Sequence, residues 1–347
     1  MGFLEQKTWI IRLLHREYWP GWIYYIPVWI QHFWLSARVK NLFFFLATNP
    51  AIEGFILSDS KYRTMQLIPD RHRPGSILLL PGMSVEGVLK VMDELQITFP
   101  VIVKPDVGFR GIKVRKVAHG AELAQVLNHQ KIPFLLQEFC SHPLELGIFY
   151  YRYPGCPKGC IPSITIKEFL TVEGTGSLTL EELVSRNPRA LLQAGAVRER
   201  FPDRWDQILP EGKVLELEPI GNHNRGTRFI DGSHMADAVL RAVFDTLSHE
   251  MEGFYFGRFD IRTPSWEALK ERREFAVLEM NGVGGEPTHI YDPTHSLFKA
   301  WKDLCSSWRV AAKIAEKNIE NGTMRPTYTK ARTLWRSYVA YRSDLLG

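Results

Sequence analysis

Cysteine is scarce in this sequence, with only four among 347 residues. So few thiols cannot form the disulfide framework of a small secreted domain, and their scarcity predicts a protein of the reducing cytoplasm. Cys156 and Cys160 lie in the stretch CPKGC with His142 upstream, which raises the alternative of a zinc site. This spacing is not that of a zinc knuckle and no second Cys or His pair follows, so we expect ordinary loop cysteines.

A strong excess of one charge is also missing. The formal net charge is +5, and the basic residues are spread along the chain. No basic stripe interleaved with aromatic residues is present, which argues against a nucleic-acid partner, whereas anionic small substrates such as nucleotides remain compatible. With 45% hydrophobic and 23% charged residues the composition is that of a globular protein, long enough for two or three lobes.

Charged residues are absent from residues 18–37, a stretch rich in Trp, Tyr and Phe. A run of about 20 apolar residues can span a bilayer, but four polar or helix-breaking residues interrupt this one. They are Pro20, Pro27, Gln31 and His32. Because Trp and Tyr favour the membrane interface over its interior, we consider three alternatives in this order. The segment packs on the main domain, or residues 18–47 make a peripheral contact with an anionic membrane, or a helix spans the membrane.

Strand and helix patterns are mixed along the chain without strict alternation, and no internal repeat is found. That mixture predicts an α+β fold in preference to a doubly wound parallel sheet. Thr179 and Glu182 form the pattern of a capping box at the start of one helix. Further helices are expected near residues 84–95, 234–251 and 296–318.

Two hydrophobic strands each carry polar side chains on one face. Because side chains alternate along a strand, Arg258 and Asp260 share a face of the run GRFDI. Glu279 and Asn281 share a face of the run VLEMN, with Leu278 on the reverse face. If the two strands pair as antiparallel neighbours, three oxygen ligands converge beside one arginine. Buried carboxylates need a countercharge, and an all-oxygen set favours Mg²⁺ or Mn²⁺. The alternative is a pair of edge strands with solvated polar faces.

A lysine ends another apolar strand. Lys104 closes the run FPVIVKP and directly precedes the loop DVGFRGIKV. Gly108 and Gly111 allow the backbone conformations in which successive N–H groups point at a phosphate, and an ammonium group beside them suits a nucleotide. The alternative is a lysine that extends to solvent from a strand end. Further along, Glu138 and Glu145 are placed to bracket an adenosine, although each alone would be an ordinary surface glutamate.

The order of these parts resembles the signature of the ATP-grasp superfamily, in particular its carboxylate–amine ligases, typified by D-alanine–D-alanine ligase. The parts are the lysines of DSK (Lys61) and VIVKP (Lys104), the glycine loop, the glutamates of QEF and LEL, then GRFDIR and LEMNG. The resemblance covers residues 61–293, and its most specific part is the pair GRFDIR and LEMNGVGGEP. It implies an α+β ATP-grasp fold in which two lobes clamp ATP.

The resemblance also implies how the nucleotide is held. The ATP phosphates would be contacted by Lys61, Lys104, Lys167 and the backbone from Gly108 to Gly111. The adenine edge would be read by Gln137, Glu138, Phe139 and Cys140, and the ribose would be held by Glu145. For Lys167, an ordinary surface charge is an equal alternative.

Metal binding and catalysis are implied for a second group of residues. Two Mg²⁺ ions would bind Asp260, Glu279 and Asn281, with Mn²⁺ as an alternative, and Arg258 would stabilise the transferring phosphoryl group. Arg225 would anchor a substrate carboxylate, since arginine binds carboxylates through two hydrogen bonds, and surface charge is again the alternative.

The implied reaction is an ATP-dependent ligation. A carboxylate substrate is activated as an acyl phosphate, and an amine substrate then attacks it to give an amide, ADP and phosphate. Backbone N–H groups of GVGGEP would stabilise the tetrahedral oxyanion. The alternatives are a phosphotransferase with the same fold and a membrane-associated ATP-binding protein without turnover. A homodimer is also left open.

The resemblance divides the chain into five parts. They are an aromatic N-terminal segment, a lead-in, a small nucleotide-binding lobe, a large lobe with the metal site, and a basic tail. Their ranges are 1–60, 61–97, 98–160, 161–320 and 321–347. The family usually has a Rossmann-like substrate domain before its ATP-binding lobes, and here the aromatic segment stands in its place. We therefore do not expect the substrate specificity of the D-alanine enzymes.

Overall fold

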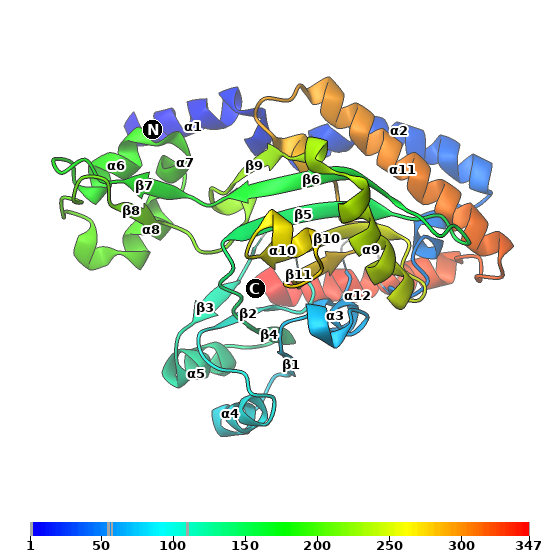
Figure 1. Ribbon diagram of the computed structural model, residues 1–347, viewed down its shortest axis with the longest axis horizontal. Coiled ribbons are helices and arrows are strands. Elements are labelled where there is room, and N and C mark those ends of the chain that lie inside the picture. The colour runs from blue at the N-terminus through cyan, green and yellow to red at the C-terminus, as the bar shows by residue number, and fades with distance from the viewer. Residues whose placement is uncertain (1–2, 54–55, 57, 109–110, 347) are drawn as a thin grey trace.

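Two antiparallel sheets form the centre of the protein (Figure 1). A computed structural model describes residues 3–53, 56, 58–108 and 111–346. The strand orders are β1-β4-β2-β3 and β11-β10-β5-β6-β9, with a separate pair of β7 and β8. Helices pack over these antiparallel sheets, so the α+β class expected from the sequence is confirmed.

The small lobe contains the four-stranded sheet. Its strands are β1 (Ser76–Leu79), β2 (Val101–Pro105), β3 (Arg115–Val117) and β4 (Phe134–Glu138). Two helices, α4 (Val85–Glu94) and α5 (Gly120–Asn128), pack on this sheet through a shared apolar core. Since β1 pairs with β4, this lobe begins earlier than the expected residue 98 and ends before β5.

The large lobe contains the five-stranded sheet. Its strands are β5 (Leu144–Tyr151), β6 (Cys160–Glu168), β9 (Arg228–Asp231), β10 (Phe256–Thr263) and β11 (Ala276–Asn281). Three helices share the principal core of this lobe or border it, namely α3 (Lys61–Gln66), α9 (Ala238–Glu250) and α10 (Trp266–Lys270). Alternation along β10 buries Phe259 and Ile261 completely in this core and leaves Arg258 and Asp260 on the other face.

A small excursion leaves the large lobe between β6 and β9 and lies at one end of the molecule (Figure 1). It contains β7 (Thr171–Glu173), α6 (Leu180–Arg186), α7 (Pro188–Leu191), α8 (Ala194–Arg200) and β8 (Val214–Glu216). The predicted capping box is confirmed, because the side chains of Thr179 and Glu182 each bond the backbone of the other residue.

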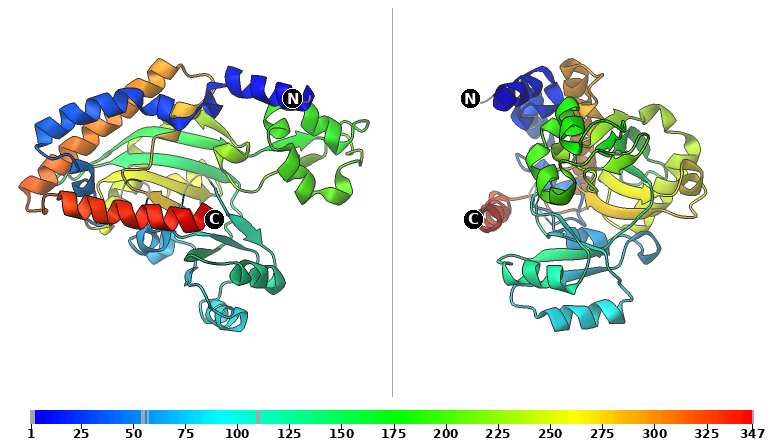
Figure 2. Two further views of the ribbon diagram at one scale, coloured as in Figure 1. Left: turned by 180° about the vertical axis from the view of Figure 1, so that it is seen from behind. Right: turned by 90° about the vertical axis from the view of Figure 1, so that its left-hand side faces the viewer.

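Helices from both ends of the chain surround the large sheet (Figure 2). They are α1 (Phe3–Leu14), α2 (Gly21–Val39), α11 (Leu297–Glu320) and α12 (Tyr328–Leu346). The aromatic segment forms α2, which packs along α11 and buries Tyr24, Val28 and Leu35 against it. Helix α12 covers most of the basic tail predicted at residues 321–347, and the composition of this tail did not indicate a helix.

Pro27 lies inside α2 and removes one backbone donor from it. The acceptor that would have used this donor is the carbonyl of Ile23, four residues earlier. Trp301 of α11 donates its indole N–H to this carbonyl at 3.0 Å. The proline is thus accommodated by the neighbouring helix. Among the residues that the structure describes, no helix combines the length and the apolarity that a membrane crossing requires.

Candidate active site

The expected pairing of the two polar strands is present. β10 and β11 are antiparallel neighbours, with Asp260 opposite Glu279 and Arg258 opposite Asn281. Asp260 Oδ2 accepts hydrogen bonds from Arg258 Nε and Asn281 Nδ2, both at 3.1 Å. The three residues expected to bind metal therefore lie on one face of the sheet, beside the arginine.

Asp260 is a buried carboxylate with several cationic neighbours. Besides Arg258, Lys167 lies 2.9 Å from its Oδ1. Burial alone would raise the pKa of Asp260, but Arg258 and Lys167 outweigh burial and hold that pKa below its usual range. Asp260 is thus ionised at neutral pH. Together with the carboxylate of Glu279 and the amide oxygen of Asn281 it makes an all-oxygen donor set that fits Mg²⁺.

A β-bulge in β11 corrects one expectation about Leu278. The register shifts between Asp260 and Ile261, so that Ile261 pairs with Val277 and Leu278 has no partner on β10. Leu278 consequently does not join Met280 in the core, but lines the cavity described below.

The bulge makes the carbonyl group of Leu278 available to the small lobe. It accepts hydrogen bonds from Lys104 Nζ at 3.1 Å and from Gln137 Nε2 at 3.2 Å. Lys104 also donates to Gln137 Oε1 at 3.0 Å. Burial lowers the pKa of Lys104 to about 8. The strand-end lysine is thus buried between the lobes and does not extend into solvent.

Lys61 lies at the start of α3 and contacts both lobes. Its Nζ donates to Gly108 O at 2.7 Å and lies 3.7 Å from Glu279 Oε1. Nearby Asp59 also lines the cavity, and burial raises its pKa to about 6. The sequence analysis missed Asp59, although its position two residues before Lys61 was a usable signal. Residues 109 and 110 of the expected phosphate loop lie outside the described residues.

A buried ionic cluster surrounds Glu145, the residue expected to hold the ribose. Its carboxylate lies 2.9 Å from Lys167 Nζ and 2.7 Å from Arg262 Nε. Burial favours a raised pKa for Glu145, but these two cations hold the pKa below its usual range. Arg262 also donates to Cys140 O at 2.7 Å, so it links the large sheet to the segment predicted to read the adenine edge. Sequence reasoning gave Arg262 no role, although it is part of the GRFDIR motif.

The predicted adenine-reading segment follows β4 at the edge of the cavity. Glu138 is exposed and accepts from Gly75 N at 3.3 Å. The ring of Phe139 lies 3.8 Å from Lys116 Nζ, measured to the ring centroid. With Gln137 and Cys140, these residues form one continuous stretch of the cavity wall.

Arg225, the predicted anchor of a substrate carboxylate, has partners in both lobes of the protein. Its Nη2 donates to the backbone carbonyls of Gly111 and Val114, at 2.8 and 3.0 Å, and its Nη1 lies 3.5 Å from Glu218. Gly111 has a positive φ of 70°, and a Cβ there would lie 3.0 Å from Asn222. In this structure Arg225 therefore holds the end of the glycine loop against the large lobe.

The site residues line one large cavity of about 1220 Å³. Apart from Arg225, every described residue whose side chain was given a nucleotide, metal or catalytic role from the sequence belongs to its lining, as do Gly108 and Gly111. Strands of both the small sheet and the large sheet contribute to this lining, which is the arrangement that the resemblance to ATP-grasp proteins implies. The cavity continues from the ionic groups to the aromatic segment, where its lining includes Tyr18, Trp22, Tyr25, Trp29 and Phe33.

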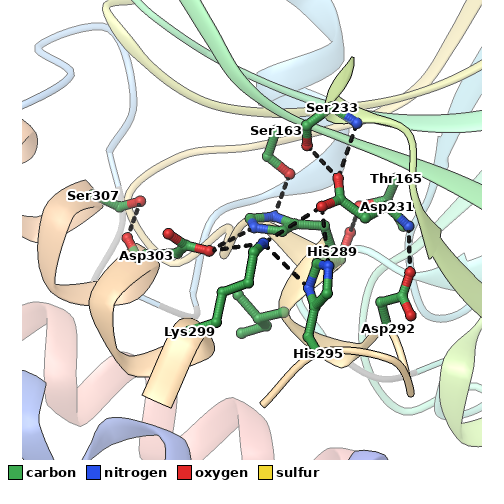
Figure 3. A network of polar contacts seen from close by, with 12 residues as sticks. Ser163, Thr165, Asp231, Ser233, His289, Asp292, His295, Lys299, Asp303 and Ser307 are labelled. Carbon is green, nitrogen blue, oxygen red and sulfur yellow. Dashed lines mark hydrogen bonds and ion pairs between the residues drawn. The ribbon is translucent and has the colours of Figure 1, made fainter. Parts of the chain in front are cut away.

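A second polar cluster lies where β9, α11 and the turn η7 (Thr288–Tyr291) meet (Figure 3). Asp231, His289 and His295 bring three potential metal-ligand atoms within 4.8 Å of one another. The ammonium group of Lys299 lies 3.4 Å from Asp231 and 3.3 Å from both His295 and Asp303. A cation of the protein itself thus lies within this cluster, and the contacts of His289 with Ser163 and Asp303 tie η7, which directly follows the loop GVGGEP in sequence, to β6 and α11.

No protein-family model matches the chain, and no curated protein does. Among solved structures the chain is similar to a D-alanine–D-alanine ligase from Bacillus anthracis, at 12% identity and a TM-score of 0.41, over 76% of this chain and 69% of that one. It is similar to the ATP-grasp ligase PsnB, complexed with minimal precursor, at 12% identity and a TM-score of 0.37, over 72% and 60% of the two chains.

A third similar structure is a bifunctional glutathione synthetase from Pasteurella multocida, at 15% identity and a TM-score of 0.37. The alignment covers 70% of this chain but only 35% of the synthetase, so this chain spans about a third of that protein. All three TM-scores are low, and we take no residue role from these neighbours. They are ATP-grasp ligases, members of the superfamily that the order of motifs in this chain resembles.

Proposed function

We propose that this protein is an ATP-dependent carboxylate–amine ligase that forms an amide bond through an acyl phosphate. One observation carries the proposal. Asp260, Glu279 and Asn281 share one face of the large sheet, and the buried ammonium group of Lys104 reaches the same strand from the small lobe. A site of this charge pattern suits a polyphosphate bound with divalent cations.

The position of each residue determines its proposed role in binding phosphates, stabilising the phosphoryl group or holding metal. Lys104 binds the phosphates from the small lobe, Lys61 binds them from the start of α3, and Lys167 binds them from the large sheet. Arg258 stabilises charge on the transferring phosphoryl group. Asp260, Glu279 and Asn281 hold two Mg²⁺ ions, which, when bound, neutralise the repulsion between the attacking carboxylate and the γ-phosphate.

The loop after β11 lies where the acyl group would be held. The N–H of Gly285 donates to Gly282 O at 2.9 Å, so it stabilises the turn itself. Arg258 Nη1 donates to Glu286 O at 2.8 Å, which ties the loop to the phosphoryl-stabilising arginine. The loop thus places its glycine backbone beside the metal ligands, where N–H groups stabilise a developing oxyanion.

Peripheral membrane contact through residues 18–47 belongs to the same proposal. Its support is the outer face of α2, which exposes Ile26, Ile30 and Trp34, none of which is among the described residues that line the cavity. Liposome flotation of the intact chain and of a variant lacking residues 1–52 tests it. Equal partitioning of the two proteins would remove the membrane from the proposal.

ADP release is the test of the ligase assignment. The protein is incubated with ATP, Mg²⁺ and mixtures of carboxylates and amines, and the products are analysed by mass spectrometry. We expect ADP release that needs both substrate types, with a product lighter by one water than their sum. A stable phosphorylated product formed without an amine would instead support a phosphotransferase, and nucleotide binding without turnover would contradict both.

A further inference from the structure

Glu286 lies where the ionic part of the cavity meets its aromatic part. Its backbone carbonyl accepts from Arg258 Nη1, one of the groups beside the metal ligands. Its side chain accepts hydrogen bonds from Tyr25 of α2 at 2.8 Å and from Tyr291 of η7 at 2.7 Å. A carboxylate offers about four lone-pair sites, so these two contacts fix its orientation and leave capacity for a further donor.

The aromatic part of the cavity is one face of α2. Trp22, Tyr25, Trp29 and Phe33 all line the cavity, and their spacing places them on one side of the helix. Trp34 lies about 100° further round the helix from Phe33 and is not among the described lining residues. Trp29 and Trp34 are similarly exposed, at 54% and 59%. Trp34 can therefore serve as the control for Trp29, which lines the cavity.

We propose that this aromatic end of the cavity binds the amine substrate, and that the amine carries a large apolar group. The inference rests on the proposed ligase function and names the substrate class of the same site. The ammonium group would contact the Glu286 carboxylate, and the apolar group would lie along Trp22, Trp29 and Phe33. Aromatic faces contribute apolar contact and attract cations, which suits such an amphiphile.

The position of Glu286 matches the chemistry that an amine needs. An ammonium group cannot attack, so its proton must first be transferred, and a carboxylate beside the acyl phosphate can accept it. The amine nitrogen then bonds to the carbonyl carbon while the bond from that carbon to the phosphate oxygen breaks; the electron pair leaves with phosphate, which also accepts the second proton of the nitrogen. A carboxylate substrate would be repelled by Glu286, which favours the amine for this end of the cavity.

Direct binding of simple probes tests the inference without turnover. We use decylamine, butylamine and decanoate below their micelle concentrations, and measure affinity by calorimetry on the full chain. Decylamine should bind more tightly than both other probes. Trp29→Ala should weaken decylamine binding by about tenfold through the lost aromatic contact, whereas Trp34→Ala should change it by less than about twofold.

Glu286→Gln should remove the preference for decylamine over decanoate. Tyr25→Phe, which removes one hydrogen bond and keeps the charge, should retain that preference. Equal losses in Trp29→Ala and Trp34→Ala would point to adsorption on the outer helix face, as for a membrane surface, and would overturn the inference. Equal affinity for decanoate would overturn the choice of an amine.

The ligase assignment can fail independently of this inference. Absence of ADP release with every substrate pair would contradict the ligase and leave the binding preferences standing. Amide formation confined to small polar amines would support the ligase and overturn the aromatic amine site.

Discussion

Individual side chains of the site hold charges that burial would otherwise suppress. Asp260 is only 6% exposed, yet its contacts with Lys167 and Arg258 keep it ionised. An isolated carboxylate at such a position would be neutral, because the cost of removing the charge from water is large. Glu279 is more exposed, and its carboxylate lies farther from a cation, at 3.7 Å from Lys61 Nζ. We therefore regard Glu279 as the ligand whose carboxylate is most available to a divalent cation.

Glu279→Gln tests the metal assignment. The substitution keeps the shape of the side chain and removes one negative charge, so Mg²⁺-dependent ADP release should fall by about 100-fold or more. Glu274→Gln is the matched control, since Glu274 lies just before the same strand and is exposed. Thermal unfolding of both variants should shift by less than about 4 °C. Full activity in Glu279→Gln would contradict the metal site.

The pH behaviour of Lys104 follows from its burial. Its pKa of about 8 lies below the ordinary value of 10.5, so between these values the unfolded chain binds one more proton than the folded protein. In that pH range the contribution of Lys104 to the free energy of unfolding increases as pH rises. A phosphate beside the ammonium group would raise this pKa, so ATP binding should take up protons near pH 8.5.

Calorimetry of Mg²⁺-free ATP binding, in buffers of different ionisation enthalpy, measures this proton uptake directly. We expect an uptake of about half a proton or more at pH 8.5. The uptake should disappear in Lys104→Met. The same uptake in that variant would assign the titration to another group and would remove the predicted phosphate contact of Lys104.

At the scale of elements, one hydrogen bond between α2 and α11 depends on a proline and a tryptophan. Trp301→Phe keeps an aromatic ring but leaves the Ile23 carbonyl without its donor, so the free energy of unfolding should fall by about 1 kcal/mol. In a Pro27→Ala background the helix gains its own N–H donor for this carbonyl, and the same change should cost much less. Urea unfolding of the four proteins measures the coupling; additive effects would contradict it.

The sequence predicted the paired strands of the site because alternation fixes which side chains share a face. It could not predict the bulge at Leu278, since any residue of β11 could have been the one without a partner. Nor could it predict β1 as an edge strand of the small sheet, because β1 pairs with β4, more than fifty residues later.

Other contacts depend on segments that meet only in the folded chain. The resemblance implied a carboxylate anchor at Arg225, which stays a prediction, and it could not reveal the contacts of this arginine with the carbonyl groups of Gly111 and Val114, because backbone acceptors have no sequence signal. Glu286 stands in a motif that was recognised, but its contact with Tyr25 joins residues 261 positions apart. Sequence spacing carries no information on such a pair.

At the scale of the whole molecule, the N-terminal segment is held by buried charges as well as by apolar packing. Glu17 is 3% exposed and accepts two hydrogen bonds from Arg189 of the excursion, at 2.8 and 2.7 Å. His223 lies 3.3 Å from the same carboxylate. Burial favours a raised pKa for Glu17, but hydrogen bonds and charge from His223 and Arg189 hold its pKa below 4.5.

Arg189→Met should destabilise the protein by about 3 kcal/mol, because it leaves a buried carboxylate without its main partner. Since the folded pKa of Glu17 is the lower one, the contribution of its ionised form is present above about pH 4.5 and is lost as pH falls through the folded pKa. Chemical unfolding at pH 7 and pH 4 measures both effects. A smaller loss in Glu17→Gln/Arg189→Met than in Arg189→Met alone would support the pairing; an equal loss would contradict it.

If the protein binds ATP as proposed, the hydrogen bond between Lys104 and the carbonyl group of Leu278 affects the rate of nucleotide association. On the proposed function, the carbonyl group of Leu278 competes with a phosphate for the ammonium group of Lys104, and this contact joins the two lobes. Gln137 and Leu278 accept from Lys104, whose ammonium group has three N–H donors, so a phosphate that makes more than one contact with this group displaces one of these acceptors. Association should then follow two stages, with an encounter that depends on ATP concentration and an exchange of partners that does not. The slower of these two stages would limit the rate at which ATP binds in successive reaction cycles.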